Sequence, residues 1–384
     1  MSHRPGEHLR RCMESVLEQA DEVLVVDNGS PGGSAGEMAI AAGARALRLK
    51  RNLGWAAAAN AGVRKTSGDV TAFLHDDVVA GNQWLAAASR LLDDPTIGAV
   101  APRVVRQGRF LEVTLKDEPS FNEQSGRQLG REIFRASLGG TDVLELLTGP
   151  GIYAPQGGKG GQGGRLARWT SGHGSFYVPL GDANGLVELE INGAQVRPSR
   201  VVDLLASAGT YLQLDGRAGD IGAGTPDEDR MESAEERFGL GSAALVTTRD
   251  VLHRVGGFCP RYFSGYEDVD WCWRARLTGL RMFFDPVTAV RRRADTPSGD
   301  GSNRASQLSE HNRIATLVRN APFGLAVREV RAVHKHGADD GVVKMPPRLI
   351  ALSLAEREVL RRRWVVRPRE VFERWAGLDV PPVA

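Results

Sequence analysis

The feature that most constrains the fold is a regular alternation of short apolar strands and helices within the first 75 residues. Strand patterns are found at 22–26, 44–49 and 70–74, and helical patterns at 5–20, 35–42 and 55–65. This alternation is typical of an α/β protein with a doubly wound, mainly parallel sheet. Ligands of such sheets bind beyond the carboxyl ends of the strands, so polar residues at those ends are the first candidates for a functional site.

One element of the alternation is missing at the start of the chain. A central strand should lead into the helix at 5–20, but only Met1 to Arg4 precede it. Either the start of the chain has been assigned too late or the sheet lacks an inner strand. We favour a late-assigned start, because the unpaired backbone groups along an inner strand edge would be costly.

The middle of the sequence departs from this rhythm. Extended runs at 175–180 and 186–191 predict a β-rich insertion, and the run GGKGGQGG at 157–164 is of low complexity. A phosphate-binding loop would need Ser or Thr after the lysine, whereas Gly160 follows Lys159, so we interpret this run as a linker.

Regular structure returns after this insertion. Residues 241–258 indicate a strand, a helix and a turn, residues 267–279 indicate a helix, and residues 280–286 indicate a strand. We therefore predict four regions, namely a first α/β half at 1–104, the β-rich insertion at 105–240, a second α/β half at 241–330 and a basic helical extension at 331–384.

Composition excludes several classes of protein. With 41% hydrophobic and 25% charged residues, the chain is not disordered or fibrous, and 49 basic against 47 acidic residues give no indication of nucleic-acid binding. Cys12, Cys259 and Cys272 lie far apart without a CxxC spacing, which fits a reducing cytoplasm. No apolar run approaches the roughly 18 residues of a membrane span, so we expect a soluble or peripheral protein.

Polar side chains follow each of the three predicted strands. They are Asp27, Asn52, and the adjacent pair Asp76 and Asp77. Asp27 also suits a turn, because Asp-Asn-Gly is good turn chemistry, and a solvated acidic turn remains an alternative for the pair. Adjacent carboxylates repel each other unless a cation compensates them, and hard oxygen ligands suit Mg²⁺ or Mn²⁺ bridging to the phosphates of a nucleotide.

Five segments together resemble a known family. They are VVDNGS at 25–30, NLGWAAAANAG at 52–62, FLHDDVV at 73–79, VGGFCPRYFSGYEDVDWCWRARLTG at 255–279 and HNRIATLVRNAP at 311–322. The sequence resembles the family 2 glycosyltransferases of the GT-A fold, and it is most similar to their bacterial rhamnosyltransferase-like and galactofuranosyltransferase-like members. The resemblance covers most of residues 5–325, with a partial echo at 211–222.

The resemblance implies roles for particular residues. Asp27 would contact the base or ribose of the donor, with Asn52 shaping the same pocket. Asp77 would hold the metal on the donor diphosphate, and Asp76 would lie nearer the ribose. Glu267 and Asp268 match the family's catalytic carboxylate motif, with Asp268 as the general base, although Asp268 also suits a helix cap.

The sequence departs from the family pattern at two places. The family usually opens with a strand and a loop that grips the nucleotide, and only Ser2 to Arg4 stand there. After residues 285–290 the family commonly has a histidine that completes the metal shell, whereas this chain has Arg291, Arg292 and Arg293. Arg292 could neutralise phosphate directly and reduce the need for Mg²⁺ or Mn²⁺, or the three arginines could form a solvated loop. His311 is a further possible ligand.

The predicted function is inverting transfer of a sugar from dTDP-rhamnose or a UDP-sugar to a cell-surface glycan or lipid-linked acceptor, in cell-wall polysaccharide biosynthesis. The alternatives are a degenerate, non-catalytic sugar-nucleotide-binding or scaffold protein, and a nucleotidyltransferase. The basic C-terminal helices, with Trp364 and Trp375, suggest peripheral contact with the inner face of the membrane, or packing against their own domain.

Overall fold

The computed structural model describes most of the chain. The described residues are 1–115, 118–122, 127–153, 166–172, 174–181, 188–228, 233–293, 302–336 and 345–380. The glycine-rich run at 157–164, which we interpret as a linker, lies outside them.

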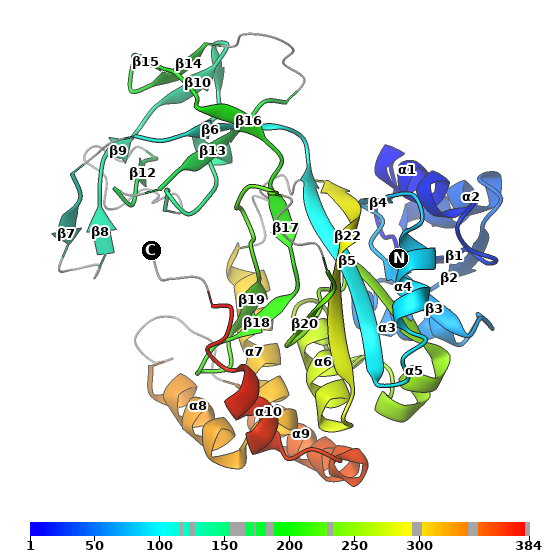
Figure 1. Ribbon diagram of the computed structural model, residues 1–384. Coiled ribbons are helices and arrows are strands. Elements are labelled where there is room, and N and C mark those ends of the chain that lie inside the picture. The colour runs from blue at the N-terminus through cyan, green and yellow to red at the C-terminus, as the bar shows by residue number, and fades with distance from the viewer. Residues whose placement is uncertain are drawn as a thin grey trace.

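The first part of the chain alternates between helices and strands as predicted (Figure 1). Its elements are α1 (Glu7–Val16), β1 (Leu24–Asp27), the 3₁₀ turn η1 (Pro31–Gly33), α2 (Ser34–Ala41), β2 (Arg45–Arg48), α3 (Trp55–Val63), β3 (Val70–Leu74), β4 (Val78–Ala80), α4 (Trp84–Leu91) and β5 (Ile97–Gln107). Helix α1 buries the apolar stripe seen in the sequence, Leu9, Cys12, Met13 and Val16, against the sheet region.

The insertion is built from short strands that form a lobe at one end of the molecule (Figure 1). Its elements are β6 (Phe110–Val113), β7 (Ser120–Asn122), β8 (Arg127–Leu129), β9 (Glu132–Ile133), β10 (Ala136–Leu138), β11 (Thr141–Asp142), η2 (Leu144–Leu146), β12 (Arg168–Trp169), β13 (Phe176–Pro179), β14 (Leu189–Ile191), β15 (Ala194–Val196) and β16 (Arg200–Val202). The chain returns to the main body through β17 (Leu205–Ser207), β18 (Thr210–Leu212), β19 (Ala218–Asp220) and β20 (Glu235–Arg237).

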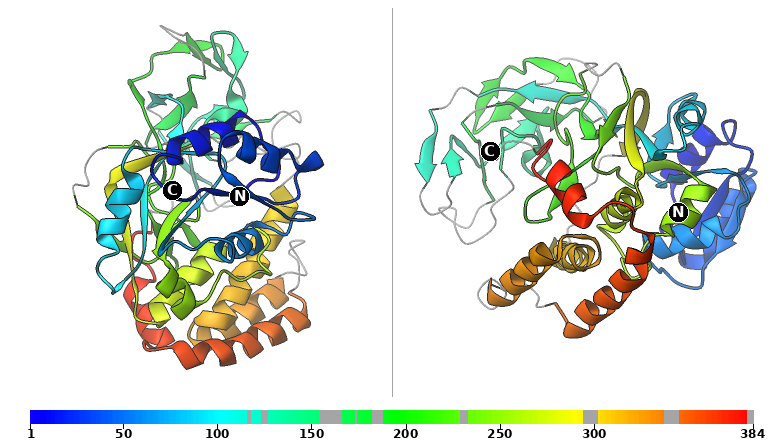
Figure 2. Two further views of the ribbon diagram at one scale, coloured as in Figure 1. Left: turned by 90° about the vertical axis from the view of Figure 1, so that its right-hand side faces the viewer. Right: turned by 60° about the horizontal axis from the view of Figure 1, so that its bottom comes forward.

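The last part of the chain adds two strands to the main sheet and then turns helical. Its elements are β21 (Ala244–Thr248), α5 (Arg249–Val255), α6 (Glu267–Leu277), β22 (Arg281–Arg293), α7 (Ser302–Asn320), α8 (Phe323–His336), α9 (Pro347–Leu360), η3 (Arg361–Arg363) and α10 (Pro368–Trp375). Helices α7–α10 lie at the end of the molecule opposite the insertion lobe, as both views show (Figures 1 and 2).

The main sheet has seven strands and mixed pairing. The order is β20-β22-β5-β21-β3, with β17 beside β5 and β4 beside β22. The α/β class is confirmed, but the sheet is not mainly parallel: β22 and β5 run parallel, whereas β21 pairs antiparallel with both β5 and β3. An apolar run such as Ala244–Thr248 predicts a buried strand but carries no information about its direction, which the path of the insertion decides.

The first two strands stand apart from this sheet. β1 and β2 form a parallel pair of their own, and among the described residues no strand pairing joins β1 to β3. On the other side of β1, the start of the chain makes a parallel bridge, between Ser2 and Asp27. The inner strand that the sequence pattern calls for is therefore represented in the structure by a single bridge.

Candidate active site

The first turn of α6 carries two adjacent acids with few partners. Tyr266, in the left-handed region at φ 66°, turns the chain into the helix. Asp268 Oδ2 accepts the backbone N–H of Ser242 at 2.9 Å, and Oδ1 accepts that of Val269 at 2.8 Å. Glu267 is only 6% exposed, and its Oε2 has no hydrogen-bond partner among the described residues. No basic side chain forms an ion pair with either acid in the part of the chain described.

Burial raises the pKa of both acids. The pKa of Glu267 is raised to about 8, first by burial and then by the neighbouring charge of Asp268. Burial also raises the pKa of Asp268, against the backbone hydrogen bonds that favour its charged form. Glu267 is therefore the member that keeps a proton near neutral pH, which leaves Asp268 as the carboxylate able to accept one.

A third acid, Asp220, comes to the same place from the insertion. Asp220 ends β19, and its Oδ1 lies close to Gly241, beside Ser242. Asp220 is exposed to solvent, yet the atoms packed around its carboxylate desolvate it and raise its pKa to about 6; the charge of Asp268 raises the pKa further, and Ser207 and Arg292 lower it. The only sign of Asp220 in the sequence is the partial family resemblance at 211–222, which does not point to this residue.

The predicted pair Asp76 and Asp77 follows β3, with its two carboxylates in different surroundings. Asp77 Oδ2 lies 3.1 Å from Arg292 Nε, and Asp77 Oδ1 is buried without a hydrogen bond. Asp76 Oδ2 lies 3.7 Å from His8 Nε2 on α1. The antiparallel pairing of β4 with β22 sets Arg292 opposite Val78 and so brings Arg292 to Asp77.

His75 and Ser242 connect the two acidic motifs. His75 Nε2 lies 3.4 Å from Ser242 Oγ, and the Ser242 backbone binds Asp268. Burial and the nearby Arg292 hold the pKa of His75 well below its usual range, so the ring is neutral. Motifs that are about 190 positions apart in the sequence therefore lie around one serine.

The side chains of Asp27 and Asn52 both form hydrogen bonds that fix the conformation of neighbouring loops. Asp27 is fully buried, and its two oxygens accept the backbone N–H groups of Ser30 at 2.7 Å and Gly36 at 3.3 Å. Asn52 Oδ1 accepts from Asn28 Nδ2 at 3.0 Å and from the Gly54 backbone at 2.9 Å. The turn interpretation of Asp27 thus describes its contacts, and its contact with a donor stays a prediction.

The Asn52 loop is joined to the α6 side of the site. The Trp55 backbone N–H donates to Phe263 O at 3.2 Å, and a Cβ added at Gly54, which has φ 82°, would meet that oxygen at 2.5 Å. The Trp55 ring lies 5.8 Å from the His75 ring, measured between centroids. The loop after β2, the loop after β3 and the start of α6 therefore meet around Trp55.

No preformed metal cage exists among the described residues. No group of three or more His, Cys, Asp or Glu side chains in the described ranges is arranged to hold an ion. The nearest approach to a donor set is Asp77 Oδ1, with His75 Nδ1 4.0 Å away. A magnesium-like ion in a nucleotide site needs only one or two carboxylates, because phosphates and water supply the rest, so a lone unpartnered carboxylate oxygen fits such a role.

The C-terminal helices pack their tryptophans against arginines of the same chain. Arg276 lies 4.3 Å from the centre of the Trp375 ring, and Arg357 lies 4.9 Å from that of Trp364. These contacts agree with the packing interpretation, and membrane contact stays a prediction. None of the described helices is both long enough and apolar enough to cross a bilayer.

Comparisons with known proteins agree with this architecture. Residues 3–141 match the family described as Glycosyl transferase family 2. Pre-mycofactocin glycosyltransferase of Mycobacterium tuberculosis, strains CDC 1551 / Oshkosh and H37Rv, is 43% identical over 49 residues, which is 13% of this chain and 10% of the relative. The match thus spans about a tenth of the length of these curated relatives.

Two solved structures were compared over nearly the whole chain. A crystal structure of GalNAc-T7 with UDP, GalNAc and Mn²⁺ aligns with a TM-score of 0.56 and 12% identity, over 97% of this chain and 55% of that one. A mannosyltransferase from Pyrobaculum calidifontis in complex with GDP-Man and Mn²⁺ aligns with a TM-score of 0.42 and 12% identity, over 94% of this chain and 83% of that one. The alignment with GalNAc-T7 shows that the chain has a GT-A fold. Residues 3–141 are the segment that matches the family 2 glycosyltransferases.

Proposed function

We propose that the protein is an inverting glycosyltransferase that uses Asp268 as its general base. The observation that carries the proposal is the convergence of Asp268, Asp220 and the Asp77–Arg292 pair around Ser242 and His75. Raised carboxylate pKa values beside a paired arginine are typical of a functional site. The rhamnosyltransferase-like or galactofuranosyltransferase-like subtype is part of the proposal.

The chemistry requires one proton acceptor and one site of positive charge. Asp268 would remove the proton from an acceptor hydroxyl while that oxygen attacks the anomeric carbon of the donor sugar. The bond from that carbon to the diphosphate breaks, and the nucleoside diphosphate leaves with the electron pair. Glu267, protonated near neutral pH, would not compete as a base, because the pKa of Glu267 is raised to about 8.

Arg292 and Asp77 would serve the donor diphosphate. Arg292 can donate two hydrogen bonds to phosphate oxygens, and the 3.1 Å contact with Asp77 orients its guanidinium. Asp77 Oδ1, unpartnered among the described residues, would hold Mg²⁺ or Mn²⁺, and a bound ion would neutralise negative charge on the diphosphate. Asp76, Asn52 and Asp27 would form the nucleoside end of the site.

The substrates proposed are dTDP-rhamnose or a UDP-sugar as donor and a cell-surface glycan or its lipid-linked precursor as acceptor. Exposed arginines at Arg361, Arg362 and Arg363 would bring the enzyme to the anionic inner face of the membrane from the cytoplasm. Sedimentation with anionic vesicles tests this directly: Gln at all three positions should reduce binding, whereas unchanged binding would contradict the proposal.

The experiment that tests the function combines binding and turnover. Thermal unfolding with UDP, dTDP, GDP and their sugars, with and without Mn²⁺, should identify the nucleotide, because ligand at 100 times its Kd stabilises by about 2.7 kcal/mol. Asp268→Asn should then lower the rate of transfer about 10²–10⁴-fold while nucleotide binding persists. A fully active variant would refute the base assignment. Absence of both binding and turnover with every donor would instead favour the non-catalytic alternative, and pyrophosphate release would indicate a nucleotidyltransferase.

A further inference from the structure

The hairpin formed by β18 and β19 brings an acid from the insertion to the edge of the proposed active site (Figure 1). Asp220 is the last residue of β19 and pairs with Thr210 of β18. Its Oδ1 lies 3.6 Å from the position of a Cβ built on Gly241. The next residue, Ser242, binds Asp268 through its backbone N–H. Asp220 and Asp268 therefore approach the same short segment of backbone.

The hairpin is held firmly in this place. Thr210 N–H donates to Gly239 O at 2.8 Å, and Gly239 N–H donates to Thr210 O at 3.3 Å. On the other strand, Ala218 N–H donates to the Tyr266 hydroxyl oxygen at 3.1 Å. Tyr266 turns the chain into α6, two residues before Asp268. The hairpin and the start of α6 are thus fixed to each other, as a binding group beside a catalytic residue must be.

The carboxylate of Asp220 is free to take a ligand. In the described part of the chain no basic side chain forms an ion pair with it, because Arg292 binds Asp77 and Arg217 of the same hairpin binds Asp215. Asp220 is also exposed, so a ligand can reach it. A charged group that is fixed, accessible and without an ion-pair partner beside a catalytic acid is suited to binding substrate.

The chemistry of Asp220 limits what this ligand can be. An ionised carboxylate accepts hydrogen bonds and cannot donate them, so the ligand must supply donors. It repels a diphosphate, which suits the Arg292 end of the site instead. Sugar hydroxyls are neutral donors, and Asp268 would already hold the attacking hydroxyl of the acceptor. A second carboxylate beside Asp268 is therefore placed to bind another hydroxyl of the same acceptor ring.

We propose that Asp220 is a specificity-determining residue that binds a non-reacting hydroxyl of the acceptor sugar and so orients the attacking hydroxyl toward Asp268. The inference rests on the proposed function. It assigns the site a neutral acceptor ring with at least one free hydroxyl besides the one that attacks. An acidic ring, such as a uronic acid, is disfavoured because Asp220 would repel its carboxylate.

The test measures binding of the methyl glycosides of galactose, glucose, mannose and rhamnose to the whole chain, by saturation-transfer NMR titration with UDP or dTDP and Mn²⁺ present. The parent should bind at least one of them. Asp220→Asn should weaken that affinity about fivefold or more, because a charged hydrogen-bond acceptor becomes neutral. Its nucleotide affinity should stay unchanged. Asp215→Asn, in the turn of the same hairpin, is the matched control and should behave as the parent does.

Deoxygenated forms of the bound glycoside identify the hydroxyl that Asp220 contacts. Removing that hydroxyl should weaken binding to the parent about fivefold or more, and it should weaken binding to Asp220→Asn by clearly less. The two changes then form a double-mutant cycle between the protein and the ligand, and non-additivity is the signature of a direct contact.

Three results overturn the inference. Equal glycoside affinity in the parent and Asp220→Asn would remove Asp220 from acceptor binding, and so would a parent that binds none of the four glycosides. Weaker binding of a nucleotide sugar to Asp220→Asn, with glycoside binding unchanged, would assign Asp220 to the donor. All of these are equilibrium measurements made without sugar transfer. Failure of this inference is therefore distinguishable from failure of the proposed function, which is judged by turnover and by Asp268→Asn.

Discussion

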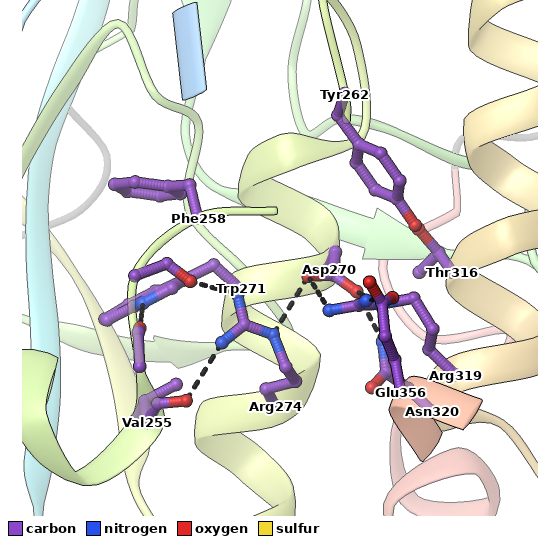
Figure 3. A network of polar contacts seen from close by, with 12 residues as sticks. Val255, Phe258, Tyr262, Asp270, Trp271, Arg274, Thr316, Arg319, Asn320 and Glu356 are labelled. Carbon is purple, nitrogen blue, oxygen red and sulfur yellow. Dashed lines mark hydrogen bonds and ion pairs between the residues drawn. The ribbon is translucent and has the colours of Figure 1, made fainter. Parts of the chain in front are cut away.

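Helix α6 carries Asp268 and, two residues further on, Asp270. The surrounding structure balances the negative charge of Asp270 but not that of Asp268. Asp270 is fully buried and surrounded by donors, with Arg274 Nε at 2.9 Å, Arg319 Nε at 2.8 Å and Asn320 Nδ2 at 2.9 Å (Figure 3). Burial alone would raise the pKa of Asp270, but Arg319 and Arg274 outweigh it and lower the pKa to about 2.

The network around Asp270 ties α6 to its neighbours. Arg274 also donates to Val255 O at 2.9 Å, and Trp271 Nε1 donates to Gly256 O at 2.9 Å (Figure 3). Arg319 extends from α7 and also contacts Glu356 of α9. The network around Asp270 therefore connects α6, α7 and α9 with the end of α5 and the residue after it.

Glu267 and Asp268 are also sheltered, but no cation in the described structure compensates them. The contrast shows that burial of an acid is not itself a sign of catalysis. A buried acid whose charge is balanced stabilises the fold, whereas one whose charge is left unbalanced has a raised pKa and can exchange a proton. Substitutions at the two positions should therefore change different properties.

The largest expected effect is on transfer by Asp268→Asn. Loss of the general base should lower kcat about 10²–10⁴-fold. The thermal midpoint should fall only modestly, because the amide oxygen can still accept the Ser242 N–H and only the hydrogen bond from the Val269 N–H is lost. Product formation and thermal unfolding measured on one preparation check both expectations. Retention of full kcat would remove Asp268 from the mechanism.

The matched substitution Asp270→Asn should affect stability instead. It leaves Arg274 buried without its countercharge and Arg319 with Glu356 alone, and breaking such a buried pair costs about 3–5 kcal/mol. Urea unfolding measures the loss. If the variant were as stable as the parent, the distinction between the two acids would fail. Transfer per folded molecule should stay within a few-fold of the parent.

A smaller effect is expected at the diphosphate end of the proposed site. Arg292→Gln should weaken nucleotide diphosphate binding about tenfold or more, since a charge-assisted hydrogen bond contributes roughly 1.5–3 kcal/mol. Asp77→Asn should weaken the dependence of binding on Mn²⁺. Calorimetric titration with UDP and dTDP, with and without Mn²⁺, separates the two effects. Unchanged affinity in both variants would place the diphosphate elsewhere.

The raised pKa of Glu267 predicts a pH dependence of stability. The folded protein holds a proton on Glu267 up to about pH 8, whereas the unfolded chain releases it near the ordinary glutamate pKa of 4.5. Between these two pH values the folded state binds more protons than the unfolded chain. The free energy of unfolding therefore falls as pH rises through this range. Glu267→Gln should therefore gain stability relative to the parent as pH rises from 5 to 8. Parallel curves of Tm against pH would argue against a protonated Glu267.

The smallest effect concerns Asp220. The carboxylate of Asp268 raises the pKa of Asp220, and this repulsion acts in both directions. Asp220→Asn should therefore shift the acid limb of kcat/KM toward lower pH. The variant Asp215→Asn is the control, because Asp215 pairs with Arg217 at the surface. If the acid limb of kcat/KM has the same midpoint in the parent, Asp220→Asn and Asp215→Asn, Asp220 and Asp268 are not coupled.

The sequence predicted local elements well where the pattern was strong. The strand at 70–74 coincides with β3, and the helix at 267–279 contains α6. Strand direction could not be predicted, because a strand as buried as β21, with four of its five residues inside the protein, has the same apolar pattern in either orientation. The roles of Asp76, Asp77, Glu267 and Asp268 came from their family resemblance, and the structure adds that His75 and Ser242 connect their motifs.

Other parts of the site could not be predicted because they depend on long-range folding. Asp220 reaches Asp268 only because the insertion returns through β18 and β19 to the main body. The sequence placed Asp27 at the end of a strand. It did not predict that the backbone N–H groups of Ser30, in a turn, and of Gly36, near the start of a helix, would bind its two oxygens. The spacing of residues along the chain does not predict which acidic side chains will form ion pairs in the folded protein.

Whether Asp268, partly buried and without a countercharge, is the proton acceptor is tested most directly by the pH dependence of kcat/KM. In the parent enzyme kcat/KM should rise with pH as Asp268 loses its proton, with a midpoint above the ordinary value of 3.8 because burial raises that pKa. The residual transfer of Asp268→Asn should lack this limb. A limb that persists unchanged in Asp268→Asn would show that another group accepts the proton.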